Sequence, residues 1–521
     1  MSSRLKRDRA RAKLSQILAI SDDRAFLQMI WCVDRLRTGD YDVGARGLTN
    51  LPPTLRRNLS ENRLLIQPWI LEDLTNEVLT VPKPKILVPR SLNCGSYEGF
   101  AHVYNAALAV DDAEAGFELE NGRHVLQAMP RIAHRQFDWQ QGWMNAPNLY
   151  RSAFIYGQGE CEEWFSAQYG LSPAQLVLFA LACQSVFRRS PTGAPGNFVV
   201  PELNLDQPVI DAALRLTAAD LSVVRESART TRRGPSNIAA RPSVLRRTPV
   251  IKVRDNIYTT PLPELVLERA TSGLYLDLVQ APSRLRDYIA QRFEQYALDL
   301  VGAVFPGEVR GDYGYGTRAL PLRTPDILVG PTNGVQAIIE CKATRMIFAA
   351  RFSDDWHIAT ERGYGELAKG VGQIWRHCSH MRRNIVADKP AQDVVGLVLT
   401  LDPWMRMTHQ QDEIILNRSR EWCAEHDPLI TAEDECPISF THMADFEALL
   451  HRTDAAGVLQ VLKDAATKIG WGMRELASAL AVKEVQQPYL LRDRMAEVLP
   501  WFDRLGKDAE KAGLLARNVT S

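Results

Sequence analysis

Hydrophobic residues recur at helical spacing along most of the N-terminal half of the chain. The first set comprises Leu14, Ile17, Leu18, Phe26, Ile30 and Val33. The stretch LSPAQLVLFALACQSVF (171–187) begins with Ser-Pro and is apolar on nearly every side, which predicts a buried central helix. We therefore predict helical regions over residues 1–90 and 91–222.

The pattern changes between residues 283 and 402, where helical and strand-like segments alternate. A helix is predicted over 283–306, starting at a Ser283 N-cap, and a second helix over 361–383. Two short runs rich in Ile and Val, before and after a turn that contains Gly330 and Gly334, predict paired strands. Residues 393–401 predict a fully buried strand. The predicted class is α/β (α+β), with a central mixed sheet flanked by helices.

A basic segment separates the helical half from this alternating region. Residues 225–254 contain eight arginines and one lysine against a single acid, Glu226, and are otherwise rich in Gly, Pro, Ser and Thr. One interpretation is a solubilising linker. The other is an arm that contacts phosphates, because arginine and lysine supply affinity for nucleic acid that does not depend on its sequence. The residues expected to do so are Arg232, Arg233, Arg246 and Arg247.

These patterns divide the chain into five regions. Residues 1–90 and 91–222 are predicted to be helical, 223–270 a basic linker, 271–405 the mixed core, and 406–521 a helical C-terminal region.

Composition narrows the class of protein without identifying it. The chain has 521 residues, its formal net charge is zero, and hydrophobic residues make up 45% of it. No apolar stretch is long enough to span a bilayer, and no secretory signal is recognisable. The eight cysteines are scattered without a C-x-x-C pair, which favours reduced thiols and argues against a zinc ribbon. We therefore expect a cytoplasmic protein without a membrane association.

Candidate chemistry lies on the two predicted strands. Pro325-Asp326 opens the first run, and Glu340-Cys341-Lys342 closes the second. Alternate strand residues share a face, so Glu340 and Lys342 point to one side and Cys341 to the other. A hairpin brings Asp326 beside them. Two carboxylates and an ammonium on one sheet face are costly unless something binds there.

The residue types suit phosphodiester hydrolysis. Mg²⁺ prefers oxygen ligands and is commonly held by one or two carboxylates with water and substrate phosphate. A bound divalent ion lowers the pKa of water, and a neighbouring lysine adds positive charge where negative charge develops. The alternative is a surface hairpin with an incidental ion pair.

The spacing and the order of elements resemble the PD-(D/E)xK nuclease superfamily over residues 283–402. The resemblance implies a restriction-endonuclease-like core in which Asp326 and Glu340 bind Mg²⁺, with Mn²⁺ able to substitute, and the carbonyl of Cys341 adds a ligand. It implies that Lys342 orients or activates the attacking water. It also implies that Glu294, on the first helix, is a further metal ligand and that Gln373, on the second, lies next to the site.

Two more cations are candidates for nucleic-acid contact. Lys369 lies one helical turn before Gln373, and Arg318 lies in the stretch GDYGYGTR, which lacks the ending of a phosphate-binding loop. For both, a solvent-exposed structural role is the alternative. His377 and His380 are too few for a zinc site.

The expected function is Mg²⁺-dependent hydrolysis of DNA, with RNA as the alternative substrate, in restriction or anti-phage defence by analogy with the family. Expected partners besides nucleic acid are a second copy of the chain or other proteins of a defence system. Two other functions remain open. One is a nucleic-acid-binding module that does not cleave, and the other is a helical interaction or scaffold protein with a coincidental motif.

Overall fold

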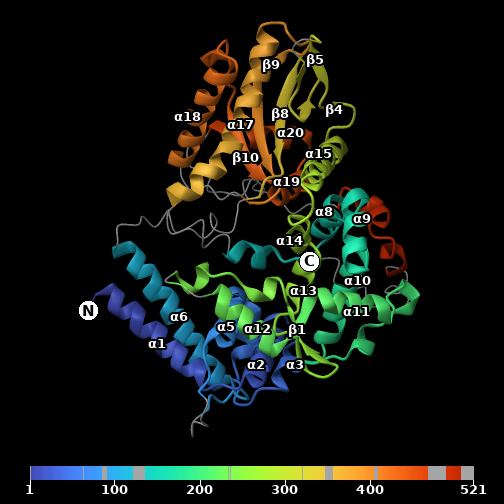
Figure 1. The fold of residues 1–521 in the computed structure, drawn as a ribbon. Helices are drawn as coiled ribbons and strands as arrows, with labels where there is room; N and C mark the ends of the chain where they lie inside the picture. The colour runs from blue at the N-terminus through green and yellow to red at the C-terminus, as the bar shows by residue number, and fades with distance from the viewer. Residues whose placement is uncertain are drawn as a thin grey trace. The chain divides into compact units, whose positions relative to one another are not determined.

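The computed structural model divides into two compact units, which we describe separately (Figure 1). The first comprises the described parts of Met1–Val125, Arg135–Ala281 and Ala496–Ser521, and the second comprises those of Pro282–Met495. The described residues are 2–62, 64–84, 91–120, 135–232, 234, 236–318, 321–345, 356–403, 409–467 and 489–505, with the backbone alone for 356–363 and 409–411.

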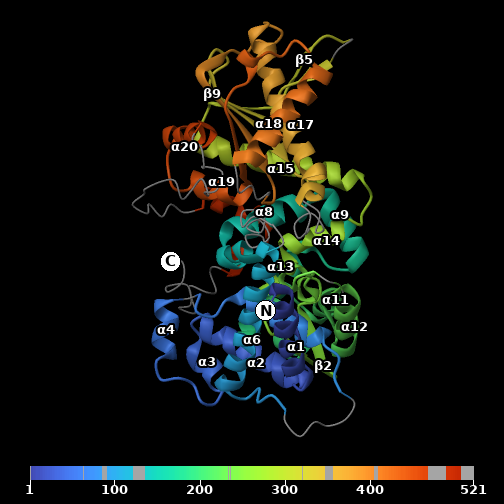
Figure 2. The ribbon, with the colours of Figure 1, turned by 90° about the vertical axis from the view of Figure 1, so that its left-hand side faces the viewer.

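The first unit is built mainly from helices (Figures 1 and 2). They are α1 (Ser3–Ala19), α2 (Asp23–Arg37), α3 (Tyr41–Ala45), α4 (Leu55–Glu61), α5 (Pro68–Thr80), α6 (Tyr97–Glu120), α8 (Ala146–Tyr156), α9 (Gly159–Tyr169), α10 (Pro173–Phe187), α11 (Gln207–Thr217), α12 (Leu221–Thr231), α13 (Glu264–Ala270) and α14 (Tyr275–Leu278). Short 3-10 helices are η1 (Pro195–Phe198), η2 (Pro201–Leu203), η3 (Ile238–Ala240), η4 (Val244–Arg246) and η5 (Ser272–Leu274).

The helix predicted over 171–187 is confirmed as α10. The Ser172 side chain accepts a hydrogen bond from the N–H of Gln175, whose own side chain caps Ser172 in return. Residues Leu176, Phe179 and Cys183 are fully buried. Across the described residues, no single helix has the length and apolar character needed to cross a bilayer; α9 and α10 reach the threshold only jointly, across a 67° bend.

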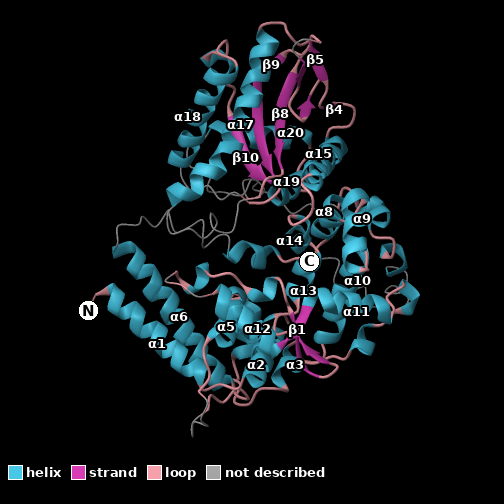
Figure 3. Ribbon diagram, in the orientation of Figure 1, coloured by secondary structure: helices cyan, strands magenta, loops and turns pink. Residues whose placement is uncertain are grey.

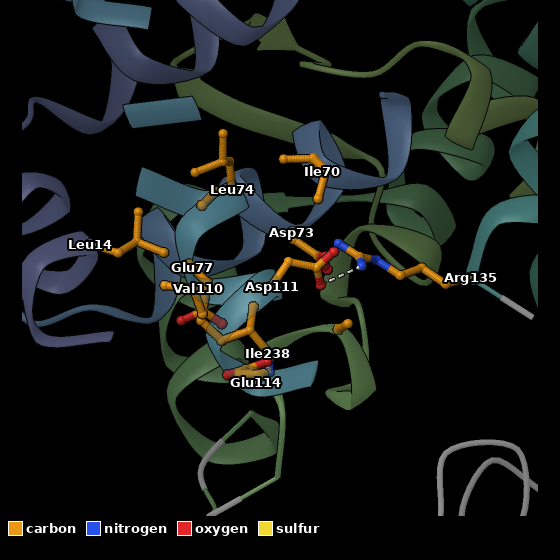
Figure 4. A pocket seen from close by; sticks show the side chains of 12 residues that line it. Leu14, Ile70, Asp73, Leu74, Glu77, Val110, Asp111, Glu114, Arg135 and Ile238 are labelled. Atoms are coloured by element: carbon orange, nitrogen blue, oxygen red, sulfur yellow. Dashed lines mark hydrogen bonds and ion pairs between the residues drawn. The ribbon is translucent and has the colours of Figure 1, made fainter. Parts of the chain in front are cut away.

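Ion pairs, most of them with little solvent exposure, join elements of the first unit that are distant in sequence. Figure 4 shows Asp73 of α5 and Asp111 of α6 facing Arg135, and Arg135 donates hydrogen bonds to both carboxylates. The Glu114 carboxylate accepts hydrogen bonds from Arg11 and from the N–H of Ile238. These pairs tie α1, α5 and α6 together around a small cavity.

The basic segment is folded, so the prediction of a linker over 223–270 is wrong. It contains most of α12, then β2 (Val250–Arg254), β3 (Ile257–Thr259) and α13. With β1 (Ala218–Asp220), the strands form a sheet of order β1-β2-β3, in which β1 and β2 are parallel. The composition suggested a linker because the acids that neutralise its arginines lie elsewhere in the chain.

The second unit contains a five-stranded mixed sheet between helices (Figure 3). Its elements are α15 (Arg284–Val304), β4 (Val309–Gly311), β5 (Gly314–Gly316), β6 (Pro321–Arg323), β7 (Ile327–Val329), β8 (Val335–Lys342), α17 (Trp356–Arg382), β9 (Pro390–Thr400), α18 (His409–His426), η6 (Ala432–Asp434), β10 (Ile438–His442), α19 (Met443–Leu450), α20 (Ala455–Thr467) and η9 (Arg492–Arg494). The short α21 (Met495–Val498) begins at its last residue.

The sheet order is β10-β9-β8-β7-β4. Strands β4, β7 and β8 pair antiparallel, whereas β8, β9 and β10 pair parallel. The mixed helix-and-strand class predicted from the sequence is confirmed. The second unit also continues beyond the predicted limit of 405, because β10, in a region predicted to be helical, adds the final strand of the sheet.

The core of the second unit lies between the sheet and α17. Leu328, Ile338 and Val398 from three adjacent strands pack against Val371 and Ile374 of α17. Most apolar residues of α15 between Leu285 and Val301 are also buried, on one face of the helix. Ser283 precedes α15 as predicted, but its side chain makes no capping hydrogen bond because its backbone is already helical.

Close packing of α17 on α18 makes Gly372 a sensitive position. A Cβ atom there would lie 2.2 Å from Cε3 of Trp422, whose ring stacks on His426. We expect Gly372→Ala to lower the free energy of unfolding by about 1–3 kcal/mol through overpacking. The matched variant Gly365→Ala, also in α17 but in open space, should leave it unchanged or raise it by up to about 1 kcal/mol. Urea denaturation measures both, and equal effects would contradict the proposed packing constraint.

Candidate active site

The β7–β8 hairpin brings together the two acids predicted from the sequence. Ile327 pairs with Ile339 and Leu328 with Ile338, so continuing the register by one residue places Asp326 opposite Glu340. The Asp326 Oδ2 atom accepts a 2.6 Å hydrogen bond from the N–H of Cys341. The carboxylate of Asp326 therefore lies against the backbone of the Glu340-Cys341-Lys342 triplet.

Lys342 and Gln373 join the same cluster. The Lys342 ammonium donates a 2.8 Å hydrogen bond to Oε1 of Glu340 and another of 2.8 Å to Oε1 of Gln373 on α17. Glu340 is 3% exposed and Lys342 9% exposed. Glu340 and Lys342 share the face of β8 that bears Ile338, which packs on α17. The ammonium is thus held between the sheet and the helix.

One carboxylate oxygen in this cluster has no hydrogen-bond partner among the residues that the structure describes. Oε2 of Glu340 is buried and accepts no hydrogen bond from any described residue, although Oε1 is bonded to Lys342. A buried anionic oxygen without a partner costs about 1–3 kcal/mol or more, so such atoms are rare in folded proteins. A cation or a water molecule bound beside Glu340 would remove that cost.

Electrostatics places Glu294 near the same carboxylates. Burial, followed by repulsion from Glu340 and Glu294, raises the pKa of Asp326 to about 8. Burial and then Glu340 raise the pKa of Glu294, on α15, to about 7. Burial alone would lower the pKa of Lys342, but Glu340 and Asp326 outweigh it and raise that pKa. The site therefore has an excess of acid, with one ammonium facing three carboxyl groups.

The donor set fits a hard divalent cation, but it is not arranged as a finished cage. Carboxylate oxygens from Asp326, Glu340 and Glu294 are the ligands that Mg²⁺ prefers. In the part of the chain that the structure describes, no group of three or more His, Cys, Asp or Glu side chains has the arrangement of a metal site. Lys342 occupies one oxygen of Glu340, and the N–H of Cys341 occupies one of Asp326.

In Cys341, the remaining residue of the triplet, the backbone and the side chain have different surroundings. Its N–H binds Asp326, while its thiol is buried and has a pKa raised well above the ordinary value, mainly by that burial. The thiol is therefore protonated and unreactive. The carbonyl as a metal ligand stays a prediction.

Sequence inspection missed Gly370. A Cβ atom at this position of α17 would lie 3.1 Å from Cε of Lys342 and 3.3 Å from Cγ1 of Val398. The lysine stem consequently passes against bare helix backbone. The available signal was a glycine inside a helical pattern, which often marks a close approach.

Two tyrosines of GDYGYGTR and the two histidines of α17 form a separate polar cluster. Tyr315 hydrogen-bonds Nδ1 of His380 at 2.6 Å, and Nε2 of His380 lies 3.1 Å from Oδ2 of Asp427. Tyr313 donates to Asp388. The bond between Tyr315 and His380 holds the β5–β6 hairpin on α17. Both ring nitrogens of His380 have protein partners, so this residue needs no metal ion to explain its position.

Two of the four candidate arginines of the basic segment form ion pairs within the first unit. The Arg232 side chain is fully buried and donates to Oε1 of Glu77 at 2.7 Å. Arg246 pairs with Glu72 at 3.0 Å and with Asp138. The charges of both are neutralised by partners more than 100 residues away in sequence. The prediction of phosphate contact is wrong for Arg232, which is fully buried, and stays a prediction for the partly exposed Arg246.

The other cations have different positions. Arg247, Arg318 and Lys369 are exposed, so phosphate contact stays a prediction for them. Arg233 lies outside the described residues.

Comparison with protein-family models, with curated proteins and with solved structures found no match.

The raised pKa of Asp326 predicts a pH-dependent gain in stability on removal of its charge. Because the folded-state pKa of about 8 exceeds the ordinary 3.8, the folded state binds the extra proton and stability falls as pH rises between these values. We expect Asp326→Asn, which retains an acceptor for Cys341, to raise the free energy of unfolding at pH 9 by roughly 1–3 kcal/mol and by progressively less toward pH 4.

Urea denaturation across this pH range is the measurement, with Asp287→Asn, an exposed position on α15, as the control. A gain that does not vary with pH would refute the carboxylate cluster as its cause.

Proposed function

We propose that this protein is a metal-dependent nuclease that hydrolyses phosphodiester bonds, with DNA as the principal substrate. The observation that carries the proposal is the convergence of Asp326, Glu340, Lys342 and Gln373 in one cluster, in which a buried carboxylate oxygen of Glu340 accepts no hydrogen bond from any described residue. These side chains come from the start of β7, the end of β8 and the middle of α17, and incidental surface ion pairs are not buried in this way.

The order of elements supports the same proposal. A helix, α15, precedes the antiparallel strands β4, β7 and β8, and α17 then leads to the parallel strand β9. This is the order expected of a restriction-endonuclease-like core, and the nearness of Asp326 to the Glu340-Cys341-Lys342 triplet supports the proposed resemblance to the PD-(D/E)xK superfamily. A 5′-phosphate and a 3′-hydroxyl are the proposed products, and restriction or anti-phage defence is the proposed setting.

The carboxylates of Asp326, Glu340 and Glu294, with the carbonyl of Cys341, would hold Mg²⁺ or Mn²⁺. A divalent ion bound there would supply a water of lowered pKa and charge for the phosphate oxygens. The protein residues have their own parts. Lys342 places a fixed positive charge beside the position of the scissile phosphate, where negative charge grows during hydrolysis. Gln373 orients that ammonium, so its direction is set before substrate binds.

Glu294 has a further capacity as a proton carrier. With a pKa raised to about 7 by burial and by Glu340, its carboxyl group gains or loses a proton near neutral pH. Entry of positive charge next to Glu340 would lower the pKa values of both Glu294 and Asp326 and ionise them as ligands.

The first test is metal-dependent stability. Mg²⁺ or Mn²⁺ at about 100 times its dissociation constant should raise the melting temperature by about 5 °C or more, because only the folded chain assembles the carboxylates. Asp326→Ala and Glu340→Ala should abolish the rise, while Asp287→Ala should keep it. Equal rises in all four proteins would place the metal elsewhere and remove the basis of the proposal.

The second test is cleavage. Supercoiled plasmid incubated with protein and Mg²⁺ should be nicked or linearised, and Lys342→Ala should reduce the rate about 10²–10³-fold through loss of charge stabilisation. Lys463→Ala, which removes a lysine paired with Asp393 on the surface of the second unit, is the matched control and should cut at the wild-type rate. Labelled single-stranded DNA and RNA in parallel reactions define the substrate.

Binding without cleavage by any divalent ion would favour the non-cleaving module. Absence of both binding and cleavage would favour the helical interaction protein.

A further inference from the structure

A groove in the first unit gathers basic side chains at one end of the β1–β2 pair. Its volume is about 550 Å³, and its charged lining consists of Arg24, Arg225, Lys252 and Arg254 with Asp220 and Asp255. Four cations against two acids give the lining a net positive charge in a chain whose overall net charge is zero. The groove is therefore a local site for an anion.

Not all of these cations are available. Arg225 is buried, and its guanidinium group already has protein partners. It pairs with Asp23 at 2.6 Å and donates hydrogen bonds to the carbonyls of Val78 and Val81. Lys252 forms ion pairs with Asp255 at 3.5 Å and Asp220 at 3.8 Å, both too long for a strong hydrogen bond.

Arg24 and Arg254 are different from Arg225. Both are exposed, and neither guanidinium group forms a hydrogen bond or an ion pair with any described residue. Two guanidinium groups and a weakly paired ammonium thus face the groove, from α2 on one side and β2 on the other.

The backbone adds to this preference for anions. The parallel register pairs Asp220 with Lys252, so β1 and β2 end together at the groove. β1 runs directly into α12, whose first residues Leu221 and Ser222 line the groove. The Asp220 side chain makes no capping hydrogen bond, so the first amides of α12 lack a side-chain acceptor. Helix N-termini and the carboxyl ends of parallel strands both favour anionic ligands.

We propose that this groove binds the phosphodiester backbone of nucleic acid, with Arg24, Lys252 and Arg254 as the phosphate contacts. The identity of the polyanion rests on the proposed function. The groove is open rather than enclosed, and its cations come from separate elements, which suits a chain of phosphates better than a single small anion. Lys252 and Arg254 end the basic segment 225–254, so this segment presents charge to solvent at its last residues as well as at Arg247.

The test measures binding to a fluorescein-labelled 30-base-pair duplex by fluorescence anisotropy. EDTA is present to remove divalent ions, so that the duplex is not cleaved. The variant is Arg24→Ala/Arg254→Ala. The matched control is Arg56→Ala/Arg57→Ala, which removes two exposed arginines of the same unit that already pair with Asp42 and Glu61. Both double variants change the net charge equally.

We expect the groove variant to bind about tenfold more weakly than wild type. The slope of log affinity against log salt should fall by about 1.8, the value for two lost phosphate contacts. The control should match wild type in both. Lys252→Gln should give about half the change in slope, and it guards against a folding defect in the double variant.

Three outcomes would overturn the inference. They are no binding by wild type, equal losses in the groove and control variants, or displacement of the duplex by 10 mM inorganic phosphate or a mononucleotide as effectively as by unlabelled duplex. Groove-dependent binding by a protein that cleaves nothing would sustain the inference and refute the proposed nuclease activity, so the two failures are distinguishable.

Discussion

The antiparallel register between β7 and β8 is the constraint on which the candidate site depends. A slip of one residue would turn every side chain of β8 to the opposite face of the sheet. The turn after β7 resists such a slip, because Gly330 has a φ of 105° and a Cβ atom there would lie 2.7 Å from the carbonyl oxygen of Gly334. With this register, Asp326 meets the Glu340-Cys341-Lys342 triplet beneath α17.

The buried charges that this register brings together lower the stability of the folded protein. Three carboxyl groups lie near one ammonium, and burial raises the pKa values of Asp326 and Glu294 into the neutral range. The apolar cluster of Leu328, Ile338 and Val398 with α17 lies on the same face of the sheet and supplies stability that the charged residues remove. Such a conflict between local charge and packing is typical of places where a protein binds something.

Much of the second unit could be predicted from the sequence, because the governing patterns are local. Short apolar runs at Ile327 and Val335, separated by turn residues, specify a hairpin, and alternation along β8 puts Glu340 and Lys342 on one face. The prediction of a linker in the basic segment was wrong because the governing contacts are not local. Arg232 pairs with Glu77 and Arg246 with Glu72, and pairs so distant in sequence leave no local trace. Strand β10 was missed likewise, since its neighbour β9 ends 38 residues before it begins.

The position of Gly370 has a consequence for sequence conservation among related proteins. Because the Lys342 stem runs against bare helix at this position, a side chain three places before the glutamine would crowd the lysine, so related chains that keep the lysine should favour glycine there. A glycine three places before a glutamine should consequently be conserved together with the acid-x-lysine triplet. In distant relatives whose remaining sequence has diverged, that pair of signatures would mark common descent.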